Sequence, residues 1–313
     1  MSSLVRQLHG QRFLVSIGPM FEFQLKHMIP SLYQTILPQE ILNLAIKETT
    51  ANCNNCVMAK ENVSSKEIHI KKSSPSIKPQ FRNLKTEYKS NLKCCTFHPF
   101  FPNYMVGAIL ADQNKKNEFG KTEIKRRIQS KNEILPLGIA APRNYQLDFL
   151  KNPSKFGQKE NLLCPFFDSK SNQCGFWIYR GSVCTSFFCA SDHSWGFKFW
   201  DELVSYLSLV EISLAELALE KMGFSGRDGM LGFDLIDLGK LEKSDRAKIS
   251  MTEKKSVQSN AFWKTYKTPE NFYLECHRQV MLMSQKDLDS ALGSILQNQK
   301  KKVLSNFKAD KSK

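Results

Sequence analysis

Apolar residues recur at helical spacing along one long stretch of this chain, residues 201–222 (DELVSYLSLVEISLAELALEKM). The residues that share one helix face are Leu203, Leu207, Val210, Leu214 and Leu217. Gly223 follows directly, and glycine commonly ends a helix because it tolerates the left-handed conformation that closes the last turn. The pattern therefore predicts a long amphipathic helix that ends at Gly223.

Shorter helices are predicted before this stretch. Residues 32–46 have helical spacing on both sides of Pro38, which is expected to begin a second helical half. Residues 104–111 are a short apolar segment that suits a helix start better than a strand. Residues 121–131 (KTEIKRRIQSK) predict a short helix with Ile124 and Ile128 on one face.

Two further helices are predicted near the end of the chain, at residues 271–283 and 286–307, and the lysine-rich tail of the second is expected to fray. No alternation of strands and helices indicates a parallel sheet. We therefore expect a mainly α fold with little β structure, in which helices pack around an irregular cysteine-rich core.

Composition is that of a soluble folded protein, with 41% apolar and 24% charged residues in 313, a length typical of about two domains. No run of 18 apolar residues predicts a membrane span, and residues 1–23 lack the continuous apolar core of a secretory signal. We expect a cytoplasmic location, where thiols stay reduced and clustered cysteines more often ligate metal than form disulfides.

Positive charge is concentrated in one part of the chain. The net charge is +15, and residues 60–131 contain 16 basic and 6 acidic residues. Residues 60–93 are polar and contain Pro75 and Pro79, which predicts an exposed basic loop. The basic region is interpreted as a solvated face, or as a contact surface for an acidic protein or nucleic acid. No nucleic-acid-binding motif accompanies it.

Nine cysteines are the least ordinary feature, and eight of them lie between residues 53 and 189. The candidate metal ligands are Cys53, Cys56, Cys94, Cys95, Cys164, Cys174, Cys184 and Cys189. The first two form a C-x-x-C pair, whose tight turn can direct both sulfurs at one metal. Eight thiolates suit two four-cysteine sites, or one cluster with spare thiols.

The adjacent pair Cys94–Cys95 favours an iron–sulfur cluster, most readily 4Fe–4S, over a single zinc ion, because successive side chains diverge. Aromatic residues interleave with the later cysteines and can form both the core and an apolar shell around a metal. Arg180 is a candidate cofactor-binding cation that would offset thiolate charge. The alternative is a surface arginine or a structural ion pair.

These motifs resemble the zinc- or iron-chelating cysteine-cluster family of the C-x-x-C-x-x-C-C type, and its longer uncharacterised bacterial subgroup. The similarity extends over residues 53–189, where the eight cysteines match the family's thiols and Ile178–Arg180 approximates an I-Y-x-R element. The chain departs from the family in the long gap between Cys56 and Cys94, and in Gly181, which stands where proline is usual. The resemblance implies metal binding more firmly than any activity.

The resemblance divides the chain into three regions: an N-terminal helical segment at 1–50, a cysteine-cluster metal-binding domain at 51–200 with the basic loop at about 60–93, and a C-terminal helical region at 201–313. The function expected is metal binding for a redox, sensing or structural purpose. A distant similarity to the cysteine-rich part of flagellin lysine N-methylases makes an S-adenosylmethionine-dependent protein methyltransferase the alternative. A zinc-stiffened nucleic-acid-binding module is a weaker one.

Other residues carry weaker signals. His98 and His193 each follow a cysteine by four residues and could complete a mixed site, although a hydrogen-bonded histidine is the more ordinary interpretation. Cys276 is expected to be a small buried residue, with a nucleophilic pair with His277 as the alternative. The glycines of residues 223–234 fit a flexible connector better than a cofactor-binding loop.

Overall fold

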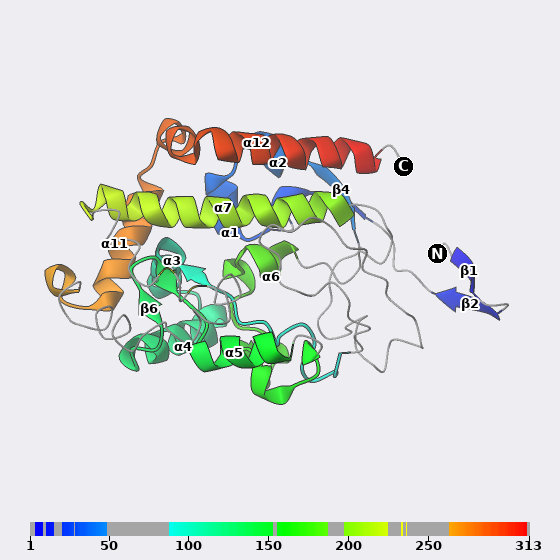
Figure 1. Ribbon diagram of the computed structural model, residues 1–313, viewed down its shortest axis with the longest axis horizontal. Coiled ribbons are helices and arrows are strands. Elements are labelled where there is room, and N and C mark those ends of the chain that lie inside the picture. The colour runs from blue at the N-terminus through cyan, green and yellow to red at the C-terminus, as the bar shows by residue number, and fades with distance from the viewer. Residues whose placement is uncertain are drawn as a thin grey trace.

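Most of the ordered secondary structure is helical (Figure 1), which confirms the mainly α prediction with little β structure. The computed structural model describes residues 4–8, 11–15, 21–27, 29–48, 88–152, 155–186, 197–224, 233, 236 and 263–311. The predicted basic loop therefore lies almost wholly outside the described residues, as do Cys53, Cys56, Cys189 and His193.

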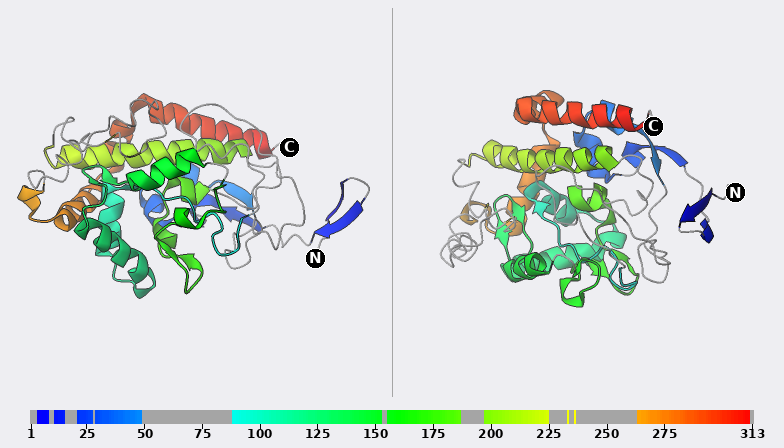
Figure 2. Two further views of the ribbon diagram at one scale, coloured as in Figure 1. Left: turned by 60° about the horizontal axis from the view of Figure 1, so that its bottom comes forward. Right: turned by 45° about the vertical axis from the view of Figure 1, so that its right-hand side comes forward.

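Helices form the body of the structure. The α-helices are α1 (Ser31–Ile36), α2 (Gln39–Leu42), α3 (Asn103–Ala111), α4 (Glu118–Gln129), α5 (Arg143–Lys151), α6 (Ser182–Ser186), α7 (Phe197–Lys221), α11 (Pro269–Met281) and α12 (Gln285–Lys311). Short 3-10 helices are η1 (Leu25–His27), η3 (Lys115–Asn117), η5 (Glu160–Leu162), η6 (Trp177–Tyr179) and η9 (Lys264–Tyr266). In every view α12 lies beside α7, and α11 packs against α3 (Figures 1 and 2).

Strands are short and form small separate sheets. The strands are β1 (Leu4–Leu8), β2 (Gln11–Val15), β3 (Phe21–Gln24), β4 (Ala45–Glu48), β5 (Phe101–Pro102), β6 (Ile134–Leu135), β7 (Gly138–Ile139), β8 (Phe167–Asp168) and β9 (Gln173–Cys174). The sheet orders are β1-β2, β3-β4, β5-β7-β6 and β8-β9, and every pair is antiparallel. The hairpin of β1 and β2 stands apart from the helices (Figure 1).

The N-terminal region is less helical than the sequence predicted. Pro38 does begin α2, since its restricted backbone suits the position before a first helical turn. Ala45 and Ile46, however, belong to β4, which pairs with β3 and leaves Ile46 fully buried. Apolar spacing could not distinguish a strand from a helix in this segment, because a four-residue strand is too short to show the two-residue period of β structure.

The long helix follows its predicted pattern. Leu203, Leu207, Val210 and Leu214 are at most 1% exposed. Gly223 adopts a positive φ of 81°, and the Phe224 N–H donates to the Leu219 carbonyl, which closes the helix end as expected. The last predicted helix is extended in the structure, where α12 continues to Lys311 and is interrupted at Gly293 (φ 50°).

One hydrophobic cluster joins the three predicted regions. It extends from Leu25 through α3 and α7 to Phe307, so the described parts of all three regions share a core. Within the described residues, no helix combines the length and apolar character needed to cross a membrane.

Candidate metal centre

Cys95 and Cys164 are joined by a backbone hydrogen bond. Cys94 and Cys95 lie at the end of a tight turn, in which the Lys93 N–H donates to the Lys89 carbonyl and Lys93 takes a positive φ of 55°. The Cys164 N–H then donates to the Cys95 carbonyl over 2.7 Å. Two segments about seventy residues apart in sequence therefore meet at their cysteines.

A small hairpin brings in Cys174. Strands β8 and β9 pair Phe167 with Cys174, and the Phe167 N–H donates to the Cys164 carbonyl over 3.0 Å. Cys164 and Cys174 are therefore held at the same end of the hairpin. Phe166 and Phe176, each two residues after one of these cysteines, pack with their ring centroids 4.3 Å apart.

Cys184 is the candidate ligand that lies on α6. This short helix packs against α7, where the buried Glu211 carboxylate accepts hydrogen bonds from the N–H (2.7 Å) and the hydroxyl (2.7 Å) of Ser182. Gly181 directly precedes α6, and a Cβ added to it would lie 3.3 Å from Glu211 Oε1, which is a tight contact. The anchoring of α6 on α7 determines where Cys184 lies.

The five described candidate thiols form one electrostatic group. A hydrogen bond with Cys94, then burial and the charges of Cys94, Cys164 and Cys174, raise the pKa of Cys95. Burial and the charges of Cys164, Cys174 and Cys94 raise the pKa of Cys184. Because each thiol disfavours ionisation of the others, the group suits a cation that would replace their protons.

The described cysteines do not complete a metal-ligand set. None of the six described cysteines forms a disulfide. As the described side chains stand, no three or more of His, Cys, Asp and Glu are placed to hold a metal ion. Cys53, Cys56 and Cys189 fall outside the described part of the chain, so the ligand role of all eight cysteines stays a prediction.

The donor chemistry nevertheless fits a thiolate-bound metal. Phe101, Phe166 and Phe176 are each about 1% exposed and pack edge to face beside the cysteines, which makes an apolar wall. Helix α4 lies directly behind this wall, because a Cβ on Gly120 would come within 2.3 Å of the Phe176 ring. Such a wall excludes water and strengthens charge interactions at a buried site.

Arg180 lies where a counter-charge to the thiols is expected. Its charge lowers the pKa of Cys174 against a larger upward effect of burial, and it acts in the same direction on Cys184. Its guanidinium stacks on Trp177 at 3.7 Å from the ring centroid and donates to the Trp177 carbonyl (3.1 Å). Neither partner is an acid, so the described contacts do not make Arg180 a structural ion pair.

Both ring nitrogens of His98 have hydrogen-bond partners within the protein. Its ring Nε2 lies 3.3 Å from the guanidinium of Arg127, which can only donate, and its Nδ1 lies 3.2 Å from the Pro99 carbonyl, which can only accept. Both ring nitrogens are therefore occupied, and the ring carries its proton on Nδ1. The hydrogen-bonded interpretation of His98 is the one that the geometry favours over a metal ligand.

Cys276 is buried on α11, and its Sγ lies 3.6 Å from Met222 Sδ. Burial raises its pKa, with Glu275 acting in the same direction, so the thiol is a poor nucleophile. These observations fit the small buried residue that the sequence predicted.

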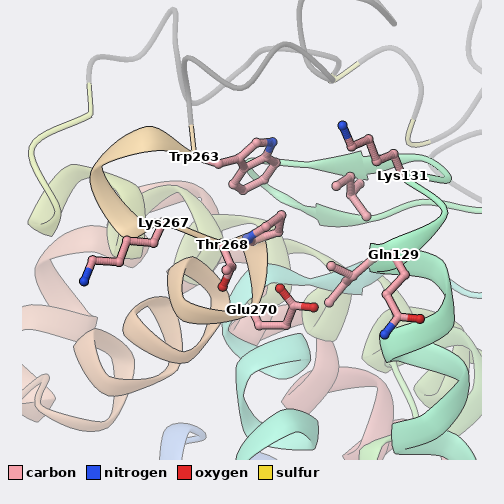
Figure 3. Close-up of a pocket in the computed structure, with 9 residues that line it drawn as sticks. Gln129, Lys131, Trp263, Lys267, Thr268 and Glu270 are labelled. Carbon is pink, nitrogen blue, oxygen red and sulfur yellow. The ribbon is translucent and has the colours of Figure 1, made fainter.

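A separate cavity of about 530 Å³ lies between α4 and α11. Its lining residues are Ile128, Gln129, Lys131, Ile134, Trp263, Lys267, Thr268, Pro269 and Glu270. Lys131 and Lys267 point away from the space that Trp263, Thr268 and Glu270 border (Figure 3). No cysteine lines it, Glu270 is the one acid in its lining, and the Thr268 hydroxyl caps α11 by accepting from the Asn271 N–H.

Sequence reasoning missed Arg127, which is 1% exposed although it lies in the basic run KRRIQ. A signal was present, since Ile124, Arg127 and Ile128 share one face of α4 by helical spacing. The buried Glu211 on α7 was missed as well, although its position next to Val210 and before Leu214 places it on the apolar face.

Comparisons of this chain with protein-family models, curated proteins and solved structures found no match in any of the three.

Proposed function

We propose that this protein binds a metal through cysteine thiolates contributed by the turn before Cys94, the hairpin of β8 and β9, and α6. The proposal is supported mainly by the hydrogen bond from the Cys164 N–H to the Cys95 carbonyl, which joins two cysteine segments far apart in the sequence. Cys174 lies on the adjoining hairpin, and Cys184 lies on α6. Cys53, Cys56 and Cys189 are the proposed remaining ligands.

An iron–sulfur cluster, with 4Fe–4S as the leading form, is the preferred occupant, and zinc is the alternative. The adjacent pair Cys94–Cys95 is awkward for one tetrahedral ion, and the aromatic wall suits a cluster whose potential depends on exclusion of solvent. Such a cluster supplies one-electron redox or sensing chemistry, or only stability. A cytoplasmic location is part of the same proposal, since it keeps the thiols reduced.

The test is metal analysis of anaerobically purified protein, together with its absorption spectrum. We expect bound iron and sulfide and a brown protein with broad thiolate-to-iron absorption. A colourless protein with stoichiometric zinc would replace the iron–sulfur assignment. A wild-type protein that binds neither metal after anaerobic reconstitution would contradict the whole proposal.

Cys174→Ser should lower metal content and thermal stability together, because metal binding is coupled to folding. Cys276→Ser is the matched control, since Cys276 is also a described cysteine but contacts Met222 instead of the candidate ligands. Equal metal content in the two variants would remove Cys174 from the proposed ligand set.

The described contacts offer less support for the nucleic-acid alternative. Within the basic run of α4, Arg126 pairs with Glu123, Lys121 donates to the Asp112 carbonyl, and Arg127 is buried. Of these three residues, Arg127 is therefore withdrawn from solvent, and the other two are paired within the protein. The methyltransferase alternative stays a prediction from the sequence, because nearly all of the glycine-rich segment that would hold a methyl donor is outside the described residues.

A further inference from the structure

The cavity between α4 and α11 combines apolar walls with a single acid. Its volume of about 530 Å³ is in the usual range of small-molecule sites in proteins. Ile128, Ile134 and Trp263 line it and are each at most 4% exposed, so its walls belong to the hydrophobic core. Because no cysteine lines it, binding of a ligand here does not depend on the proposed metal site.

Trp263 is held in place where it borders the cavity. Its indole ring packs edge to face on Phe272 at a centroid distance of 5.0 Å and lies 5.9 Å from the Tyr273 ring, both on α11. The Tyr266 N–H donates to the Trp263 carbonyl (3.0 Å) in the turn that leads to α11. The aromatic wall is therefore preorganised, and a ligand can contact it with little ordering of the side chain.

Glu270 supplies the negative charge of the cavity. It is partly buried, and its carboxylate borders the same space as the Trp263 ring (Figure 3). The described residues give this carboxylate no hydrogen bond and no ion pair, whereas Glu275 on the same helix pairs with Arg278. Glu270 is therefore available to a ligand.

The two lysines in the lining leave this charge in place. Lys131 and Lys267 are exposed, and their side chains point away from the space that Glu270 borders (Figure 3). The charge that faces the cavity is therefore negative, although the protein as a whole is positive. A carboxylate attracts a cation through its charge, and an aromatic ring attracts it through its quadrupole.

We propose that this cavity binds an organic cation, with an alkylammonium group between Trp263 and the Glu270 carboxylate and a carbon chain against Ile128 and Ile134. The apolar walls suit the hydrocarbon part of such a ligand, and the acid and the indole suit its charged end. A free amine and the lysine side chain of a peptide both present this chemistry, and the experiment distinguishes the two sources.

Glu270 also lies in the first turn of α11, where an acid stabilises a helix through its dipole. The experiment must therefore separate ligand binding from helix stability. Glu270→Gln removes the charge and keeps the size of the side chain. Glu275→Gln is the matched control, because Glu275 is an acid of the same helix that does not line the cavity.

The measurement is the shift of the Trp263 indole N–H resonance, assigned from its loss in Trp263→Phe, during titration with butylammonium, 1-butanol or butyrate. These probes are similar in size and differ in charge, and we expect butylammonium to bind most tightly. Glu270→Gln should bind butylammonium about 5–10-fold more weakly and leave the affinity for butanol unchanged. Glu275→Gln should match the wild type. Lower thermal stability of Glu270→Gln with unchanged butylammonium affinity would show a purely helix-stabilising role and overturn the proposal.

Lys131→Met tests the sign of the charge that the cavity prefers. It should strengthen butylammonium binding about 2-fold, because it removes a repelling charge near the cavity. Tightest binding of butyrate, with a loss in Lys131→Met, would instead show an anion site. Equal affinity for butylammonium and butanol would show a purely apolar site. Either result, or no shift with butylammonium, would refute the proposal.

A blocked glycyl-lysyl-glycine peptide identifies the source of the cation. Binding at least as tight as that of butylammonium would support a lysine side chain of a protein partner, whereas butylammonium binding without peptide binding would support a free amine. Because the cavity contains no cysteine, all these titrations can be repeated with chelator present. Loss of metal binding alone would therefore refute the proposed function and leave this inference standing.

Discussion

At the scale of single residues, the most consequential features are charged groups buried without a full counter-charge. Glu211 accepts hydrogen bonds from Tyr33 and Ser182 inside the core, and burial still raises its pKa to about 7. Tyr104 lies near the same carboxylate, and its buried hydroxyl has no partner among the described residues. Glu211 thus anchors α6, which carries Cys184. The free-energy cost of burying its carboxyl group depends on pH, because the group is charged only at higher pH.

Glu211→Gln should make stability less sensitive to pH. In the unfolded chain the carboxyl ionises near pH 4.5, whereas the folded protein keeps its proton until about pH 7. The folded state therefore binds more protons in this interval, and its stability falls as pH rises from about 4.5 to 7, by about 3 kcal/mol in total. The uncharged amide oxygen can still accept from the Tyr33 hydroxyl and the Ser182 N–H, while the amide NH2 would donate to the Ser182 hydroxyl oxygen.

The measurement is the free energy of urea unfolding at pH 5 and pH 8. The advantage of Glu211→Gln over the wild type should grow between these values. Glu220→Gln, an exposed change on the same helix, is the control and should follow the wild-type curve. Parallel curves for wild type and Glu211→Gln would show that Glu211 does not titrate in this range.

At the scale of elements, two glycines are required for different physical reasons, one for the packing of two helices and one for the end of a helix. Gly107 lies inside α3, where a Cβ would come within 2.0 Å of the Tyr273 carbonyl on α11. Gly223 ends α7 with a positive φ of 81°, and a Cβ there would meet no atom within 4 Å. The first glycine permits two helices to approach, and the second permits one helix to end.

Gly107→Ala should therefore destabilise the protein although alanine favours helices. The helix gains about 0.5–1 kcal/mol from alanine, but backbone on α11 must move, and overpacking of this kind costs about 1–3 kcal/mol or more. Gly223→Ala should cost only about 1 kcal/mol, from the left-handed backbone alone. Thermal unfolding of both variants is the check, and a Gly107→Ala protein as stable as wild type would mean that α3 and α11 separate readily.

At the scale of the whole molecule, one large hydrophobic cluster joins described residues from Leu25 to Phe307, although the β1–β2 hairpin stands apart from the helices. Helix α7 is central to it, with α6 on one side and α12 on another (Figure 1). The cysteine segments join this cluster through Cys164, Phe166 and Phe176. Metal binding and core packing should therefore stabilise the same folded state.

One cooperative unfolding transition is the expected consequence. Tryptophan fluorescence samples all four tryptophans, among them Trp177 on η6, Trp200 on α7 and Trp263 near α11. Far-ultraviolet circular dichroism reports all helices. The two signals should change at the same urea concentration, and chelator should move both midpoints down together if metal is bound. Separate midpoints would show that the cysteine segments and the helical core unfold independently.

The sequence by itself determined the main helices, because apolar periodicity, Pro38 and Gly223 act through local geometry. It also identified which residue types could bind metal. Only the tertiary structure decided that the Cys95 and Cys164 segments meet and that α6, which carries Cys184, is anchored on Glu211, since these contacts join residues far apart in the sequence. The burial of Arg127 could not be predicted for the same reason: whether a cation in a basic run faces solvent or the protein interior depends on what its helix packs against.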